Sequence, residues 1–257
     1  MRRQALWVMA MGCCAAILVS VAPDAQGGSA TPITSCGQVV TTNAFLTGDL
    51  YCPGSDGVVV GASGITIDLK GHWLRGNSGS ATNGVESVGF QKVTVKNGKV
   101  RNFDVGVYLS AADGSSVSNI FSTGNPGQGI YLTGDSLSVK SSTTWGNGGS
   151  GVQVFGDGAT IKSVSASANS IGIYINVGDS ARIQSSTASG NLAYGIFVAG
   201  DAPVIKGNRA EANGFINGTS DFFGHGIRVQ NYTTPPVGKN MSLGNDNLAE
   251  CDPAYLC

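Results

Sequence analysis

Apolar and polar residues alternate in short stretches along most of the chain, and glycine-rich turns separate these stretches. Residues 129–148 (GIYLTGDSLSVKSSTTWGNG) and 151–170 (GVQVFGDGATIKSVSASANS) share one order: Gly, an apolar triplet, Gly-Asp, a second triplet ending in Lys, a Ser/Thr run and Asn. A period of two is typical of a strand with one buried face. Gly-Asp and Asn-Gly pairs favour turns. Each unit therefore predicts two or three short strands.

The unit repeats at a fixed interval of 22 positions, which three columns of residues show independently. The columns are Asp113, Asp135, Asp157, Asp179 and Asp201; Asn125, Asn147, Asn169, Asn191 and Asn213; and Val95, Val117, Val139, Ile161, Ile183 and Ile205. Strands this short cannot bury a face alone, so each turn of chain must stack on the next, about 4.8 Å away. The sequence predicts an all-β fold, a parallel β-helix solenoid of about nine coils with about 22 residues per coil.

The repeat has the features of a known superfamily. The 22-residue units, together with the N-terminal stretches CGQVVTTNAFLTGDLYC and GITIDLKGHWLRG, resemble the right-handed parallel β-helix proteins of the pectin-lyase-like group, especially exported bacterial ones. The resemblance covers about residues 36–245.

The buried column through Ile130, Val152, Ile173 and Ile196 is expected to stack inside. We expect Asn147 and its equivalents to turn inward and bond the turn backbone of neighbouring coils.

Residues 1–30 differ from the repeat. Arg2 and Arg3 precede an apolar run over residues 5–22 and a small-residue stretch, which is the pattern of a secretory signal. An uncleaved N-terminal anchor is the alternative, although the run is short for a membrane span. The remainder, 31–257, is predicted as one β-helix, with an N-terminal cap coil at 36–57, coils at 58–245 and a C-terminal cap at 246–257. We expect a secreted, periplasmic or cell-surface protein without a membrane span once the signal is removed.

Cysteines gather near both ends of the mature chain. They are Cys36, Cys52, Cys251 and Cys257. An exported chain favours disulfides, and the spacing favours pairing within each end, although three connectivities exist. A zinc site is the alternative, but the chain has no CxxC pair and only two histidines, His72 and His225.

Composition and charge narrow the class of partner. The chain has 39 glycines, 12% charged residues and a formal net charge of −1, which is not the footprint of a nucleic-acid binder. The aspartate column fits solvated turns; calcium binding or acid-base chemistry are the alternatives, without a specific motif for calcium, and no other cofactor or metal is indicated. We expect a monomer whose partner is a polysaccharide or cell-surface glycan.

One column of residues points outward between two apolar neighbours in each unit. It reads Glu86, Tyr108, Tyr131, Gln153, Tyr174, Phe197 and Arg228. A line of rings along a solenoid suits stacking on sugar rings, while the alternative is that the rings only stabilise adjacent strands. Tyr108, Tyr131, Tyr174 and Phe197 are therefore predicted to bind substrate.

The repeat is interrupted once, between Asn213 and Gly226. The insert carries Phe215, Asp221, Phe222, Phe223 and His225. Insertions in solenoids form loops, often on the binding face, so we expect this one to overhang Phe197 and Arg228 and contribute to the site. The alternative is a loop that caps the end of the rod with its own phenylalanines.

Catalysis is a separate hypothesis. Residues 224–226, Gly-His-Gly, resemble one motif of polygalacturonase-type glycosidases, which implies Asp201, His225 and Arg228 as catalytic candidates, but the adjacent aspartate pair and the Arg-Ile-Lys motif of those enzymes are missing. Resemblance to uronate lyases points instead to the basic residues Lys96, Lys99 and Arg101. The sequence leaves three functions open: polysaccharide binding, polysaccharide cleavage, and a structural or adhesive role.

Overall fold

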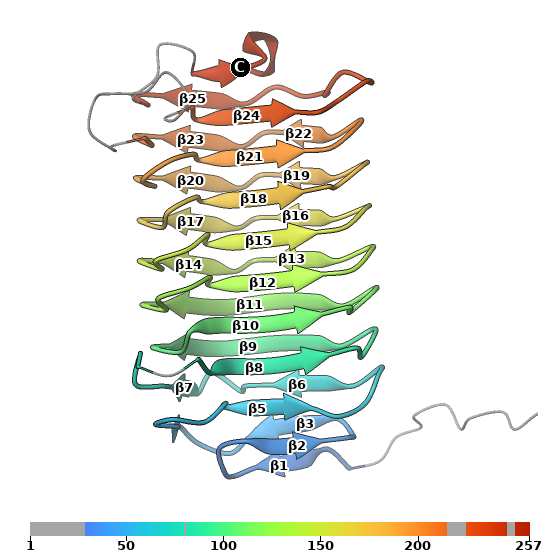
Figure 1. Cartoon of the computed structure of the whole chain (residues 1–257), viewed down its shortest axis with the longest axis vertical. Helices are drawn as coiled ribbons and strands as arrows, with labels where there is room; N and C mark the ends of the chain where they lie inside the picture. Colours follow the sequence, from blue (N-terminus) through green and yellow to red (C-terminus); the bar gives the residue numbers. More distant parts are fainter. Residues whose placement is uncertain (1–28, 80, 215–224, 246–249) are drawn as a thin grey trace, which may run out of the picture.

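The protein is a rod built from one coil of chain stacked on the next. The computed structural model describes residues 29–79, 81–214, 225–245 and 250–257. Within these residues the chain forms two parallel sheets that run the length of the rod (Figure 1). The predicted signal segment falls almost entirely in residues 1–28, outside the described residues. The all-β solenoid fold is confirmed.

The ten-stranded sheet takes one strand from each coil. Its strands are β2 (Gln38–Val40), β5 (Val58–Val60), β8 (Asn83–Val88), β10 (Val105–Ser110), β12 (Ile130–Thr133), β15 (Val152–Phe155), β18 (Ile173–Asn176), β21 (Ile196–Ala199), β24 (Ile227–Gln230) and β26 (Cys251–Asp252). Every strand pairs in parallel with the equivalent strand of the neighbouring coil, as Figure 1 shows.

The sixteen-stranded sheet covers two sides of the rod. It contains β1 (Thr31–Ile33), β3 (Ala44–Leu46), β4 (Leu50–Tyr51), β6 (Thr66–Asp68), β7 (Trp73–Arg75), β9 (Thr94–Arg101), β11 (Ser116–Thr123), β13 (Ser138–Lys140), β14 (Thr143–Trp145), β16 (Thr160–Lys162), β17 (Ser165–Ser167), β19 (Arg182–Gln184), β20 (Thr187–Ser189), β22 (Val204–Lys206), β23 (Arg209–Glu211) and β25 (Met241–Leu243). A bend divides it, because residues such as Asn97, Asn119 and Ser141 adopt left-handed backbone there. In later coils the bend separates two short strands, while β9 and β11 run through it.

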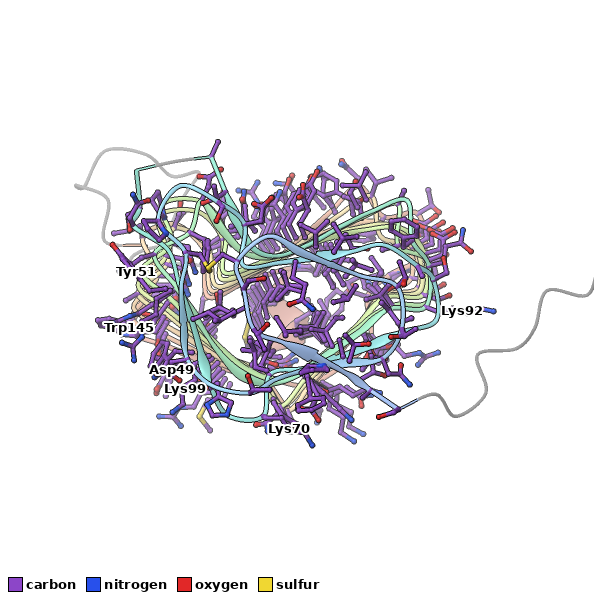
Figure 2. All side chains as sticks on the ribbon, turned by 90° about the horizontal axis from the view of Figure 1, so that it is seen from below. Asp49, Tyr51, Lys70, Lys92, Lys99 and Trp145 are labelled. Atoms are coloured by element: carbon purple, nitrogen blue, oxygen red, sulfur yellow. A yellow bond between two sulfur atoms is a disulfide. The ribbon has the colours of Figure 1, made fainter. Side chains whose placement is uncertain are left out.

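The interior consists of files of apolar side chains, one above the other. The register places Ile130 opposite Val152, Val152 opposite Ile173, and Ile173 opposite Ile196, as the sequence predicted. The predicted file from Val95 to Ile205 is confirmed in the same way. Seen along the axis, the side chains of successive coils lie over one another (Figure 2). A 22-residue period therefore fills the core with repeated layers.

The asparagine ladder is buried at one corner of each coil. The side-chain oxygen of Asn169 accepts from the backbone N–H and the side-chain amide of Asn147, 3.1 and 2.9 Å away. The side-chain amide of Asn169 donates to the backbone carbonyl of Thr144 and to the side-chain oxygen of Asn191. The predicted inward orientation is confirmed. The glycine that opens each unit makes room for the ladder, since a Cβ on Gly151 would lie 2.7 Å from the Asn169 amide.

The coil that contains β18 departs from the 22-residue spacing on both of its sides. Ile173 pairs with Val152 and with Ile196, one position short of the usual interval on the first side and one position beyond it on the second. The strand therefore begins one residue early, and the turn after it contains one residue more. That turn includes Val177, which is 69% exposed and has φ of 53°, a left-handed conformation that is unfavourable for a β-branched residue.

Disulfides close both ends of the rod. Cys36 bonds to Cys52 and Cys251 bonds to Cys257, which are the pairs that the spacing favoured. The pairs agree with an oxidising location. Strand pairing begins at Thr31, ahead of the predicted cap coil, and a short 3-10 helix, η1 (Ala254–Leu256), follows the last strand. No helix in the described part of the chain is long and apolar enough to cross a membrane.

Candidate functional site

The ten-stranded sheet carries the predicted outward column in register. Tyr131 stands between the buried residues Ile130 and Leu132, and it pairs with Tyr108 on one side and with Gln153 on the other. The column continues through Tyr174, Phe197 and Arg228. These side chains are partly exposed. The strand alternation that buries one face therefore presents the other to solvent as a single row.

The rings form a continuous aromatic row, which we define as Tyr108, Tyr131, Phe155, Tyr174 and Phe197. Successive ring centroids are 5.3, 5.8, 6.3 and 5.2 Å apart. Phe155 was missed by the sequence reasoning. It occupies the next outward position on β15 and fills the gap that Gln153 leaves. The same alternation could have found it, had the second outward position of each strand been considered.

Ring orientation changes along the row. The planes of Tyr108 and Tyr131 are within 5° of parallel, whereas the later pairs are tilted by 52° to 69°. Stacked and edge-to-face contacts both stabilise aromatic pairs. Burial raises the pKa of Tyr131 and Tyr174, and Tyr108 adds to the rise at Tyr131, so both hydroxyls stay protonated donors near neutral pH.

A polar cluster lies at the C-terminal end of the aromatic row. The ring centroid of Tyr194 lies 5.1 Å from that of Phe197 and 6.3 Å from that of His225, and the planes of Tyr194 and His225 are nearly parallel. The Arg228 guanidinium donates to the Tyr194 hydroxyl at 3.1 Å and approaches the Asp252 carboxylate at 3.6 Å. The structure thus brings His225 and Arg228 together. Tyr194 was missed, because it precedes the strand and no column in the sequence marks it.

Asp201, the third catalytic candidate, is held elsewhere. It follows β21, whereas His225 precedes β24, so the length of a strand separates them along the rod surface. Its carboxylate accepts hydrogen bonds from the backbone and hydroxyl groups of Thr233 and Thr234. The Thr234 backbone N–H, the Thr233 hydroxyl and their further bonds lower the pKa of Asp201 to about 2. This ionised carboxylate therefore accepts the hydrogen bonds of the turn at Thr233 and Thr234.

The other aspartates of the column form a ladder with the same geometry. The Asp135 carboxylate accepts from the Asp157 backbone N–H at 2.9 Å, and Asp157 accepts likewise from Asp179. Each carboxylate therefore caps the turn of the next coil. Among the described residues, no three His, Cys, Asp or Glu side chains gather in a group that could hold a metal ion.

A carboxyl pair lies at the N-terminal end of the aromatic row. Glu86 pairs with Tyr108 in the sheet register and hydrogen-bonds to Asp56. Partial burial, followed by the bond to Asp56 and its charge, raises the pKa of Glu86. The row is thus bounded by an acidic group at one end and by Arg228 at the other.

The remaining predicted residues are those of the insert and the basic residues near the bend. Phe215, Asp221, Phe222 and Phe223 lie outside the described residues, so their predicted role stays a prediction. The basic residues implied by resemblance to lyases are divided by the bend at Asn97. Lys96 lies before the bend, whereas Lys99 and Arg101 lie beyond it on the second half of the sixteen-stranded sheet.

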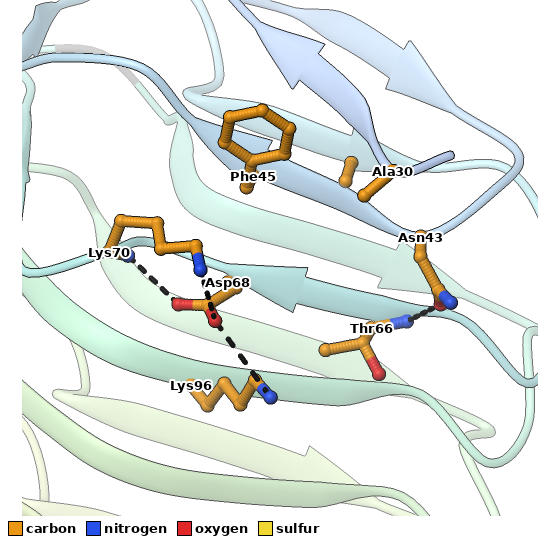
Figure 3. A pocket seen from close by; sticks show the side chains of 8 residues that line it. Ala30, Asn43, Phe45, Thr66, Asp68, Lys70 and Lys96 are labelled. Atoms are coloured by element: carbon orange, nitrogen blue, oxygen red, sulfur yellow. Dashed lines mark hydrogen bonds and ion pairs between the residues drawn. The ribbon is translucent and has the colours of Figure 1, made fainter. Parts of the chain in front are cut away.

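A depression of about 440 Å³ lies near the N-terminal end, before that bend (Figure 3). Its floor carries Asp68, whose carboxylate lies 3.7 Å from the Lys70 ammonium and 3.8 Å from that of Lys96. The single carboxylate balances the charge of one of the two lysines. Phe45 lines the wall of the depression.

Comparisons with known proteins agree with this architecture. Among solved structures, the chain is similar to the A-module of the mannuronan C-5 epimerase AlgE6 of Azotobacter vinelandii, with a TM-score of 0.55 and 16% identical residues over 84% of this chain and 80% of that chain. At this identity the similarity shows the fold alone. No curated protein sequence matches the chain. The family model described as right handed beta helix region matches residues 106–247, more than half of the sequence. The chain belongs to the right-handed β-helix family.

Proposed function

We propose that the protein binds polysaccharide along the outward face of the ten-stranded sheet. The observation that carries this proposal is the aromatic row, whose rings follow the rod axis over successive coils and stay partly open to solvent. Apolar C–H faces of sugars pack on aromatic rings, while hydroxyl groups of sugars bond to amphipathic tips such as those of tyrosine. An extended chain lying along the rod would meet one ring after another.

Polar side chains beside the rings suit the same ligand. The Gln128 amide donates to Gln153 at 3.1 Å, which holds both amides beside the row. The protonated tyrosine hydroxyls can donate to sugar oxygens. The fold is shared with the A-module of an epimerase named for mannuronan, a polysaccharide, and this is further support. Because the rings also contact one another, some of their area stabilises the sheet, and the exposed remainder is what a glycan would cover.

The test replaces two rings by leucine, which keeps apolar volume but removes the flat face. For Tyr131→Leu/Tyr174→Leu we expect at least tenfold weaker binding to the glycan that binds the wild type most tightly in a panel of acidic and neutral polysaccharides. Tyr255→Leu is the matched control, since Tyr255 is exposed near the C-terminus and lies outside the row. Equal affinities of all three proteins, or no binding to any glycan of the panel, would contradict the proposal.

A second candidate function, polysaccharide modification, is favoured by the cluster of Tyr194, His225 and Arg228. An imidazole stacked on a tyrosine, with a guanidinium on the tyrosine hydroxyl, combines a proton acceptor with a group that can hold a carboxylate. Its position at the end of the aromatic row would place a bound chain beside it.

Product analysis separates the two candidates. The protein is incubated with uronate polymers, with and without calcium, and the products are examined for new chain ends and for altered sugar composition. Activity that His225→Gln abolishes while glycan affinity changes less than threefold would establish modification. Unaltered polymers leave glycan binding as the function.

A further inference from the structure

The second half of the sixteen-stranded sheet presents a different outward surface near the N-terminal end of the rod. Its strands are β4, β7, the end of β9, the end of β11, and β14. The register places Trp73, Lys99, Phe121 and Thr143 in one outward column, and Tyr51, Arg75, Arg101, Thr123 and Trp145 in the next. These positions differ in type from coil to coil, whereas the repeat would place Ser or Thr there.

We define the Trp73 cluster as Trp73, Arg75, Lys99, Arg101 and Phe121. The two guanidinium carbons lie 5.5 and 5.1 Å from the centroid of the indole, and the lysine ammonium lies 5.5 Å from it. The phenylalanine ring meets the indole edge-on at 6.0 Å. Cation–π attraction holds the charged groups over the ring. Three cations thus converge on one indole.

Negative charge at this surface is smaller than the positive charge. The carboxylate that contacts the cluster is Asp49, which accepts from the Arg75 guanidinium at 3.0 Å and lies 3.6 Å from His72. The Trp73 backbone N–H also donates to Asp49, at 2.9 Å. In the described part of the chain, one carboxylate therefore faces three basic side chains.

Unused donors accompany this excess of charge. The Nε atoms of Arg75 and Arg101 are buried and find no hydrogen-bond acceptor among the described residues. A buried donor without an acceptor costs free energy, and like charges in neighbouring strands repel. An anion bound beside the two guanidinium groups would relieve the repulsion between them.

The aspartate ladder is too distant to supply that anion. Seen along the rod axis, Tyr51, Asp49, Lys99 and Trp145 lie on one side of the rod, whereas Lys92 lies on the other (Figure 2). The Lys92 backbone N–H donates to the carbonyl of Asp113, the first residue of the aspartate ladder. The repeated carboxylates therefore occupy the opposite side.

A depression beside the cluster and two exposed rings extend this surface along the rod. A depression of about 340 Å³ lies beside the cluster, and its lining includes Lys99 and Phe121 together with Asn97 and Asn119 of the bend. At the two ends of the outer column stand Tyr51 and Trp145, which are 64% and 53% exposed. Four strand spacings separate them, about 19 Å along the rod.

We propose that the Trp73 cluster is a second ligand site, which binds an acidic polysaccharide through its carboxylate or sulfate groups. Arg75, Arg101 and Lys99 hold the anionic groups, and Tyr51 and Trp145 pack on sugar rings at either end. This site lies on another sheet from the aromatic row and does not depend on the function proposed for that row.

A polysaccharide fits this surface better than other polyanions. Isolated rings at the two ends suit separate sugar units, and the cations between them are few and fixed. A protein that binds nucleic acid carries an extended positive field, while this chain has a net charge of −1. The ligand is therefore a chain of moderate charge that runs along the rod.

The test measures binding of the full protein to three acidic hexasaccharides, which are hexagalacturonate, hexamannuronate and a heparin-derived hexasaccharide. Fully methyl-esterified hexagalacturonate serves as the neutral counterpart. We expect calorimetry to show that at least one acidic probe binds at 50 mM salt, and that Arg75→Gln/Arg101→Gln weakens this binding at least tenfold. The ester should bind at least tenfold more weakly than the acid.

Matched variants keep the test specific. Lys140→Gln/Lys162→Gln removes the same charge from an exposed lysine column before the bend, and it should change the affinity less than twofold. Lys99→Gln, whose side chain is exposed, should weaken binding three- to tenfold and guards against misfolding of the arginine variant. Thermal melting of each variant checks the fold.

Several results would overturn the proposal. They are absence of binding to all three acidic probes, equal losses in the arginine and lysine double variants, and equal affinity for acid and ester. Displacement of the hexasaccharide by a hexanucleotide at the same concentration would show a general polyanion surface instead. Loss in Tyr131→Leu/Tyr174→Leu but not in the arginine variant would assign the binding to the aromatic row alone.

Discussion

Two polar ladders run along the two corners that flank the ten-stranded sheet, and both join each coil to the next through a side-chain oxygen. The asparagine ladder is buried, with 0 to 3% of each residue exposed from Asn125 to Asn213, whereas the aspartate ladder lies at the surface. In both, an oxygen accepts from the backbone N–H of a neighbouring coil. The difference is in what surrounds the rest of the side chain.

Burial determines which side chain each corner can use. The Asn169 amide must donate as well as accept, because the Thr144 carbonyl and the Asn191 oxygen both face it without access to water. The Asp157 carboxylate only accepts, and water solvates its remaining oxygen. Repeated polar residues are thus explained by coil stacking, and chemistry specific to this protein must be sought where the repeat is broken.

Exchanging the two side chains has the largest expected effect. Asn169→Asp places a carboxylate against two acceptors in a dry corner, so we expect the free energy of unfolding to fall by about 4 kcal/mol at pH 7. The pKa of the new carboxyl should be raised, and part of the loss should therefore disappear below pH 5. Urea unfolding at both pH values measures this.

The reverse exchange is the control. Asp157→Asn keeps the accepting oxygen at an exposed corner, and we expect a change within about 0.5 kcal/mol. A loss at position 157 as large as that at 169 would show that charge, rather than burial, distinguishes the ladders.

A substitution in the turn that contains Val177, beside the aspartate ladder, should have a smaller effect on stability, of opposite sign. Val177→Gly removes the strain of a β-branched residue in left-handed backbone, while it also gives the unfolded chain more conformational freedom. Because the first effect is the larger, we expect the free energy of unfolding to rise by about 1 kcal/mol. The side chain is largely exposed, and little packing is lost. Thermal unfolding would measure a higher midpoint, and an unchanged or lower midpoint would indicate that the turn needs its valine.

The last aspartate of the ladder gives the smallest effect, which depends on pH. Its bonds to Thr234 and Thr233 lower the pKa of Asp201 to about 2 from the ordinary value of 3.8. The ionised form is favoured by folding, so its contribution is present above pH 3.8 and is lost as the pH falls through about 2. Asp201→Asn should flatten the decline in melting temperature between pH 4 and pH 2. An identical decline in both proteins would contradict this.

The fold could be read from the sequence because its columns repeat. The file from Val95 to Ile205 and the asparagine ladder follow the 22-residue spacing, the column from Tyr108 to Phe197 follows it to within one residue, and stacking then fixes which face each occupies. The disulfide pairs followed from the short separations of Cys36 from Cys52 and of Cys251 from Cys257.

Positions that do not repeat were harder to predict. Arg75 and Trp73 belong to an early coil in which the spacing between equivalent strands differs from 22, so no column places them beside Lys99 and Arg101. Tyr194 lies in a turn, where side-chain direction depends on local backbone. The role of Asp157 as an acceptor for the next coil requires a contact across coils that spacing alone does not specify.

The strand pairing has a mechanical consequence. Hydrogen bonds between coils point along the rod, β1 lies at one end of the rod and the C-terminus at the other (Figure 1), and each disulfide closes a short loop near one end. A pulling force on the two ends would therefore load one layer of bonds at a time and peel the rod open in steps. Each coil of about 22 residues that unfolds would lengthen the extended chain by at most about 75 Å.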